Sequence, residues 1–329
     1  MRHALVAVLT IGLIGIPANG QQEGVSVSTP SAATPHSGVD SVDRAELLKV
    51  IAEYEGVARR AEAQHYTDPS LVKVYVQLGG MYYDVAMFPK AEDAMRQAIV
   101  MLRQNGPQDQ LADEIGHLAE LHIATGRTRE AEKDHLEALK IRESIGDPVG
   151  LALTWTDLAS LYVKERQYKK AVDFGQRSYA IVGNNPQVTP TDRVAIRQIL
   201  GTALSETHDS MRAIPMLKDA VAIAESSFGA DSLSAGIASY VLGNAYWRSG
   251  DLVDAGTWMQ RGTARMKLDL GWGHPAYVDA IANYAKFLRA RGQMEAAATV
   301  EREVKQANSI VDARSLTTRS SAFAGAPPR

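Results

Sequence analysis

Residues 242–259 read LGNAYWRSGDLVDAGTWM. Apolar and small residues recur here every three to four positions on both sides of Gly250, which is the spacing of one helix face. A glycine between two such segments marks a bend. The stretch therefore predicts a hairpin of two helices, with Gly243 on the first helix and Ala255 on the second where the helices meet.

The same pattern occurs six times along the chain. Its leading positions are 40 or 42 residues apart: Leu78, Leu118, Leu158, Leu200, Leu242 and Tyr284. Glycine or alanine follows each of them directly, and thirteen residues after each stands an alanine: Ala91, Ala131, Ala171, Ala213, Ala255 and Ala297. Helices approach closely only where the side chains between them are small. The fixed period predicts an all-α fold, a solenoid of about six stacked hairpins.

A large residue four positions after each of these alanines would fill the space inside the hairpin. The third and sixth copies depart from this rule, because they carry Gly175 and Glu301 there. We therefore expect looser packing inside these two hairpins.

The start of the chain has the layout of a signal peptide. Arg2 precedes an apolar run, residues 4–16, and small residues lead to Gly20. We expect residues 1–20 to be cleaved after Gly20, which makes the mature protein secreted or periplasmic. The apolar run is short for a membrane span, and an uncleaved N-terminal anchor is the alternative.

Composition divides the rest of the chain. Residues 21–42 and 308–329 carry few large apolar residues, so we expect a disordered linker and a disordered tail. A helical pattern over residues 43–70 predicts an N-terminal capping helix or half-repeat, ahead of the solenoid proper at 71–307. The six repeats span about 71–107, 108–148, 149–190, 191–232, 233–275 and 276–307.

Charge and cysteine content exclude several kinds of protein. The chain has 35 Lys and Arg against 38 Asp and Glu, so it lacks the basic excess of a nucleic-acid-binding protein. It has no cysteine, which excludes disulfides, thiolate metal sites and a cysteine nucleophile.

The repeats resemble a known family. The third copy places Trp155, Leu158, Ala159, Tyr162 and Ala171 at the positions of the tetratricopeptide fingerprint. The period of 40 to 42 residues, with Gly and Pro between copies, resembles the kinesin-light-chain-like subgroup, which has bacterial members. The resemblance implies a right-handed superhelix whose first helices line a concave groove for a peptide or an extended partner segment.

Helical spacing places positions two and five after each leading residue in that groove. Aromatic, amide and cationic side chains gather in its C-terminal half, a set suited to a peptide backbone or a carboxylate. The alternative is that these are ordinary solvated residues. The candidate groove residues are Tyr83, Glu120, Tyr240, Asn244, Trp247, Arg248, Asn283, Lys286 and Arg289.

Residues with the chemistry of a catalytic or metal site are sparse. His117, Glu120 and His122 share one predicted helix, but their order differs from that of a metalloprotease zinc motif. His122 and His135 occupy core positions of the repeat, so we assign no metal and no cofactor. No phosphate-binding loop or nucleophile elbow is present in the sequence.

These observations predict a non-catalytic scaffold or adaptor that is exported and binds a protein or peptide partner in its groove. One alternative is a structural subunit of an envelope or secretion assembly that uses the convex face. Another is a glycan-binding or glycan-processing protein. We expect no nucleic-acid partner, and no integral membrane span once the signal peptide is removed.

Overall fold

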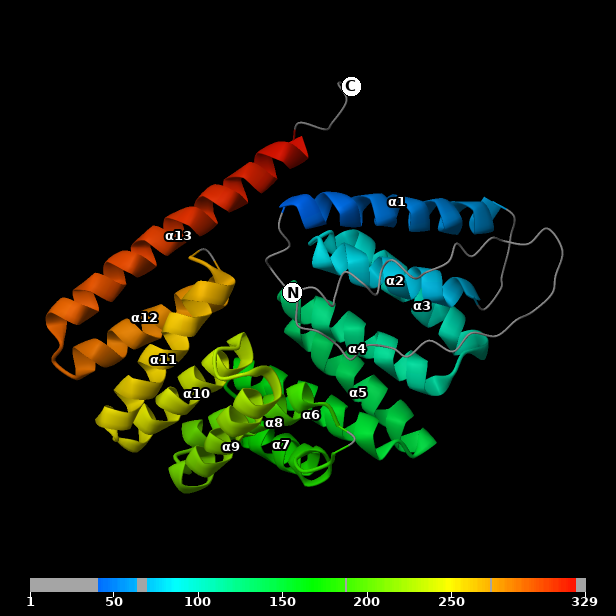
Figure 1. The fold of residues 1–329 in the computed structure, drawn as a ribbon. Helices are drawn as coiled ribbons and strands as arrows, with labels where there is room; N and C mark the ends of the chain where they lie inside the picture. The colour runs from blue at the N-terminus through cyan, green and yellow to red at the C-terminus, as the bar shows by residue number, and fades with distance from the viewer. Residues whose placement is uncertain (1–40, 64–69, 187, 273, 324–329) are drawn as a thin grey trace. The chain divides into compact units, whose positions relative to one another are not determined.

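The computed structural model describes residues 41–63, 70–186, 188–272 and 274–323 (Figure 1). The predicted signal peptide and residues 21–40 of the predicted linker lie outside the described residues. The described part contains thirteen α-helices and no strand, so the all-α prediction is confirmed.

Helix α1 (Ser41–Ala63) precedes six helical hairpins, each of which contacts the next. In each of the first five hairpins the two helices are about equally long. In the sixth, the second helix extends well beyond the first (Figure 1). The hairpins are α2 (Ser70–Asp84) with α3 (Phe88–Asn105), α4 (Gln108–Ala124) with α5 (Thr128–Ile145), α6 (Pro148–Lys164) with α7 (Tyr168–Val182), α8 (Pro190–Glu206) with α9 (Ser210–Phe228), α10 (Leu233–Ser249) with α11 (Leu252–Leu270), and α12 (Pro275–Ala290) with α13 (Met294–Phe323).

Small residues hold the helices of each hairpin together. The six alanines of the repeat are all fully buried. A β-carbon added to Gly243 would lie 2.6 Å from the side chain of Met259, and one added to Gly201 would lie 2.6 Å from that of Leu217. The first helix thus offers a glycine where the second offers a large residue, and together they fill the space between the helices.

The third hairpin fills this space differently from what the sequence predicts. Gly175 is buried, and a β-carbon added there would lie 3.2 Å from Leu200 in α8. The leading residue of the fourth hairpin therefore packs against the third. The expected loose packing at this glycine was wrong, because a neighbouring hairpin supplies the missing side chain.

All six hairpins turn through the same backbone conformation. The residue eight positions after each leading residue has a positive φ, between 59° and 90°. The amide after it donates to the carbonyl five residues back, for example from Asp251 to Tyr246 at 3.0 Å. Three hairpins have glycine at this position (Gly126, Gly250 and Gly292), and three have a residue with a β-carbon (Ala86, Arg166 and His208).

This shared turn leads to a prediction about stability. We expect His208→Gly to raise the free energy of unfolding by about 0.5 kcal/mol, because only glycine adopts a positive φ without steric cost. Gly250→Ala should lower it by about 1 kcal/mol for the same reason. Thermal denaturation of both variants measures the effect, and a stabilised Gly250→Ala protein would contradict it.

Both ends of the helical array differ from the sequence prediction. Helix α1 begins at Ser41, within the segment predicted as linker, and α13 continues to Phe323, through most of the predicted disordered tail. Residues 308–323 contain neither glycine nor proline, and the next glycine is Gly325, so nothing in this segment interrupts a helix. None of the described helices combines the length and the apolar character needed to cross a membrane.

Candidate functional site

Three of the predicted groove residues meet between α10 and α12. The side-chain amide of Asn283 donates to Asn244 Oδ1 at 2.6 Å and to the Tyr240 hydroxyl at 3.2 Å. Burial raises the pKa of Tyr240, and its hydrogen bonds to the two amides oppose that shift. All three side chains are partly exposed. We call these residues the amide cluster.

Trp247 lies one turn beyond Asn244 on α10. Its ring meets Phe287 edge to face, with centroids 5.6 Å apart and planes at 79°. Phe287 is fully buried and stacks in turn on Tyr284. This packing fixes the orientation of the tryptophan, which is itself only partly buried.

The cationic residues predicted for this end differ in their availability. Arg289 forms a bidentate ion pair with Glu301 of α13, at 2.5 and 2.7 Å, and Arg248 pairs with Glu206 of α8. Both guanidinium groups therefore have a carboxylate partner within the solenoid, although the side chains of Arg248 and Arg289 remain 44% and 53% exposed. Lys286 is exposed on α12. The Arg289 pair also explains Glu301, the polar residue at the sixth hairpin's filling position.

The two remaining predicted residues, Tyr83 on α2 and Glu120 on α4, lie in the N-terminal half. Burial, then the charge of Glu120, raises the pKa of Tyr83 to about 12. Burial also raises the pKa of Glu120, and the nearby charges of His117 and Lys164 oppose that shift. Tyr83 and Glu120 therefore lie near each other, apart in sequence from the amide cluster.

Asp157 on α6 is a residue that the sequence analysis missed. Its side chain is half-buried. Burial raises its pKa to about 8, the charges of Glu120 and Asp192 act in the same direction, and Arg142 and His117 oppose them. Asp157 and His117 both directly precede the leading residue of their repeat, which is the signal that could have identified the pair.

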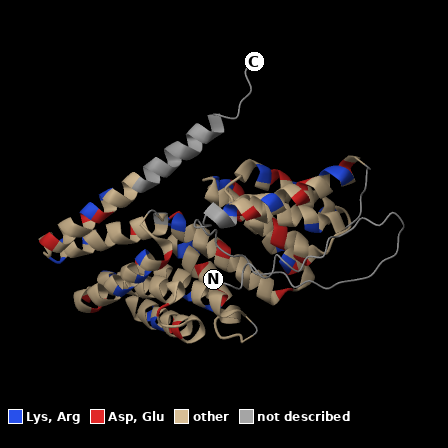
Figure 2. Cartoon of the chain, turned by 45° about the horizontal axis from the view of Figure 1, so that its top comes forward, with Lys and Arg blue, Asp and Glu red and all other residues tan. Residues whose placement is uncertain are grey.

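His117 joins these carboxylates on α4. Burial lowers its pKa, but the hydrogen bond to Glu114 at 3.2 Å and the charges of Asp113 and Asp157 outweigh burial, so the pKa is raised. Figure 2 shows acidic and basic positions interspersed along the helices, so this concentration of carboxylates is local. We call it the acidic cluster; its members are Asp113, Glu114, His117, Glu120 and Asp157.

The histidines considered for a metal site lie in separate surroundings. His122 is buried, with Nδ1 2.7 Å from Asp134 and Nε2 3.6 Å from Glu92, whereas His117 turns to Glu114. Within the described ranges, no three His, Asp or Glu side chains are placed to hold one metal ion.

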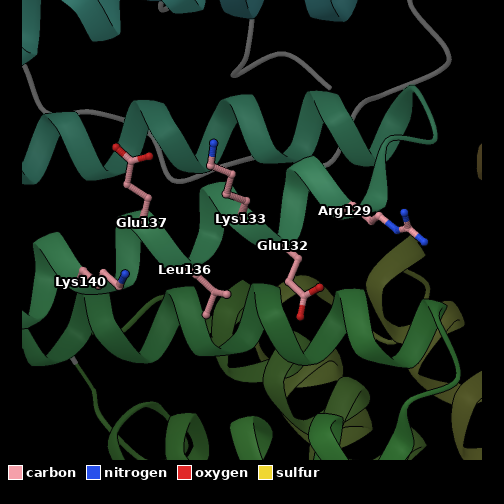
Figure 3. A pocket seen from close by; sticks show the side chains of 6 residues that line it. All are labelled: Arg129, Glu132, Lys133, Leu136, Glu137 and Lys140. Atoms are coloured by element: carbon pink, nitrogen blue, oxygen red, sulfur yellow. The ribbon is translucent and has the colours of Figure 1, made fainter.

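A surface depression of about 520 Å³ lies along α5 (Figure 3). Its lining side chains all come from this one helix, and two of its carboxylates already have partners: Glu137 pairs with Arg103 at 2.5 Å, and Glu132 accepts from the Tyr162 hydroxyl at 2.6 Å. An open, solvated helix face of this kind offers little to a ligand.

Comparison with known proteins supports the fold. Residues 114–183 match the tetratricopeptide repeat family. No curated protein sequence matches the chain. The structure is similar to the apo form of RapI, with a TM-score of 0.68 and 13% identity over 82% of this chain and 94% of that one.

Two further solved structures share the architecture. One is a putative kinesin light chain from Podosopora anserina with nearly identical TPR-like repeats, at a TM-score of 0.51 and 18% identity over 61% of this chain and 96% of that one. The other is a Rap protein complexed with competence and sporulation factor, at a TM-score of 0.52 and 14% identity over 80% and 77%. At these identities the likeness establishes the fold alone.

Proposed function

Since the chain is a solenoid of tetratricopeptide-type hairpins, we propose that it is a non-catalytic scaffold that holds an extended segment of a partner protein against its first helices. The amide cluster is the observation that carries this proposal. The predicted resemblance to kinesin-light-chain-like repeats and the Rap complex support a binding role of this type.

The amide cluster has the chemistry to bind a peptide backbone. A primary amide offers a donor and an acceptor, as a peptide group does. Among the described residues, the side-chain oxygen of Asn283 accepts no hydrogen bond, while its amino group holds Asn244 and Tyr240 in place. An extended segment can donate a backbone N–H to this oxygen, and its apolar side chains can rest on Trp247.

Export is part of the same proposal. The signal-peptide layout of residues 1–20 supports a partner in the periplasm or outside the cell. The absence of cysteine suits either compartment, because the fold then needs no control of thiol oxidation.

Removing the amide cluster tests the proposal. In a crosslinking pull-down from the native envelope fraction, we expect Asn244→Leu with Asn283→Leu to reduce recovery of a specific partner at least tenfold. Leucine is close to asparagine in size but cannot pair with a backbone, so the partner's buried polar groups would be left unpaired.

The matched control is Gln176→Leu with Gln260→Leu, which removes two exposed amides from second helices. Circular dichroism checks that both double variants fold. If the two variants recover the same partners as wild type, binding uses the convex face or the terminal segments, and the amide cluster is not the site.

A further inference from the structure

We propose that the acidic cluster binds a lysine or arginine side chain of the partner segment. This inference rests on the proposed function. It predicts that the bound partner segment carries a cationic side chain where the segment passes the second and third hairpins. The argument starts from three features of the cluster: its geometry, its buried unpaired atoms, and the absence, among the described residues, of a Lys or Arg ion pair to Glu120 or Asp157.

The cluster is assembled from two consecutive first helices. Glu120 lies on α4 and Asp157 on α6, and the charge of Glu120 acts on Asp157. Both are accessible to solvent, Asp157 partly and Glu120 at 42% of its side chain. Consecutive first helices line the same face of a solenoid, so a segment lying along that face meets both carboxylates.

Two buried side chains directed at the cluster have polar atoms without partners. Glu114 is 2% exposed; its Oε2 lies 3.2 Å from His117 Nδ1, and its Oε1 has no hydrogen bond. His135 on α5 is 1% exposed, neither ring nitrogen is hydrogen-bonded, and Nε2 lies 3.7 Å from Glu120 Oε1. Buried polar atoms usually have a hydrogen-bond partner, so these two side chains leave hydrogen-bonding capacity beside Glu120 that the described residues do not use.

The cations nearest the cluster are already engaged. Arg142 pairs with Asp113 and, at 3.1 Å, with Asp147. Lys164 donates to the carbonyl of Ile123 at 3.3 Å. Within the described chain, neither Glu120 nor Asp157 forms an ion pair with Lys or Arg, so each can accept a charge-assisted hydrogen bond from a cationic ligand.

Binding a cation here would be linked to proton release. The groups facing Asp157 are Glu120 and His117 from α4, Arg142 from α5 and Asp192 from α8. Since the pKa of Asp157 is raised to about 8, the carboxyl group is mostly protonated at pH 7. A bound cation lowers that pKa and displaces the proton. Affinity should therefore rise from pH 6 to pH 9.

The test uses a purified protein and a defined probe. The probe is a fluorescein-labelled Gly-Ser decapeptide with two arginines, and its neutral counterpart carries citrulline at the same positions. By fluorescence anisotropy, we expect the arginine probe to bind at least tenfold more tightly than the citrulline probe at pH 8, and Glu120→Gln with Asp157→Asn to abolish this difference.

The matched control is Glu143→Gln with Asp219→Asn, which makes the same charge change at two exposed positions on second helices and should retain the difference within twofold. The substitutions in the acidic cluster preserve side-chain size and remove charges that burial disfavours, so we expect the double variant to fold. If it unfolds, the single Glu120→Gln variant replaces it in the binding comparison. Equal binding of both probes to wild type, or equal losses in both double variants, would overturn the proposal.

A small polycation offers the same chemistry as a partner side chain. Spermidine is therefore added as a competitor, and displacement of the arginine probe at an equal concentration would assign the cluster to small polycations instead of a protein segment. The anisotropy assay does not use the native partner, so a negative result in it would overturn the acidic-cluster proposal alone. The proposed function is tested separately, by the pull-down with the Asn244→Leu and Asn283→Leu variant.

Discussion

Replacing Arg142 by methionine should lower the free energy of unfolding by about 2 to 3 kcal/mol. This nearly buried guanidinium on α5 pairs with Asp113 on α4 and with Asp147, whose other oxygen caps α6 by accepting from the Gly150 amide at 2.9 Å. A β-carbon added to Gly150 would lie 1.7 Å from Arg142 Nη1, so the chain leaves room for the pair. Removing the guanidinium leaves the carboxylates of Asp113 and Asp147 without their cationic partner at the contact between the second and third hairpins.

The surface pair of Arg177 and Asp173 gives the control. Both side chains are more than half exposed, so Arg177→Met should cost less than about 0.5 kcal/mol. Chemical denaturation of both variants, followed by circular dichroism, measures the difference. Equal costs for the two variants would show that the Arg142 pairs contribute no more than a solvated surface pair.

Asp157→Asn should stabilise the protein, and the gain should depend on pH. Since the pKa of Asp157 is raised from 3.8 to about 8 in the folded state, ionisation costs stability progressively as pH rises from 4 to 8. Asparagine avoids that cost. We expect no gain near pH 4 and a gain of about 1 to 3 kcal/mol at pH 8.5, less than an unscreened carboxylate would give because the side chain is partly exposed.

Thermal denaturation at pH 4.5, 6, 7 and 8.5 measures this gain. Glu143→Gln is the control, because Glu143 is exposed and its removal should have the same small effect at every pH. If the gain in stability from Asp157→Asn does not change with pH, the pKa of Asp157 is not raised in the folded protein.

The sequence was sufficient to predict the solenoid because each hairpin repeats the same local requirements. The leading positions and the six alanines are buried or nearly so, and the confirmed fold follows from their spacing. Packing between hairpins was harder to predict. Leu200 belongs to the fourth copy by its spacing, and only the structure shows that it covers Gly175 of the third.

The same limit applies to the candidate site. Helical spacing was enough to place Tyr240, Asn244 and Asn283 near one another, because they face one side of α10 and α12. It gave no indication that Arg289 pairs with Glu301, since that contact depends on side-chain reach between helices. The acidic cluster was missed because Asp157 looks like any solvated carboxylate until Glu120, 37 positions earlier in the sequence, lies beside it.

The packing of Leu200 against Gly175 also bears on how such an array can gain or lose units. Excising the fourth hairpin, residues 191–232, would remove Leu200, the side chain that packs against Gly175 of the third. A shortened chain would need a larger residue at position 175, or a leucine supplied by the newly adjoining hairpin. Leu242 holds the equivalent leading position in the fifth hairpin, so deletion of one whole period brings a leucine back to Gly175. We therefore expect deletion of a whole repeat to be tolerated more readily than a deletion that changes the spacing of the leading residues.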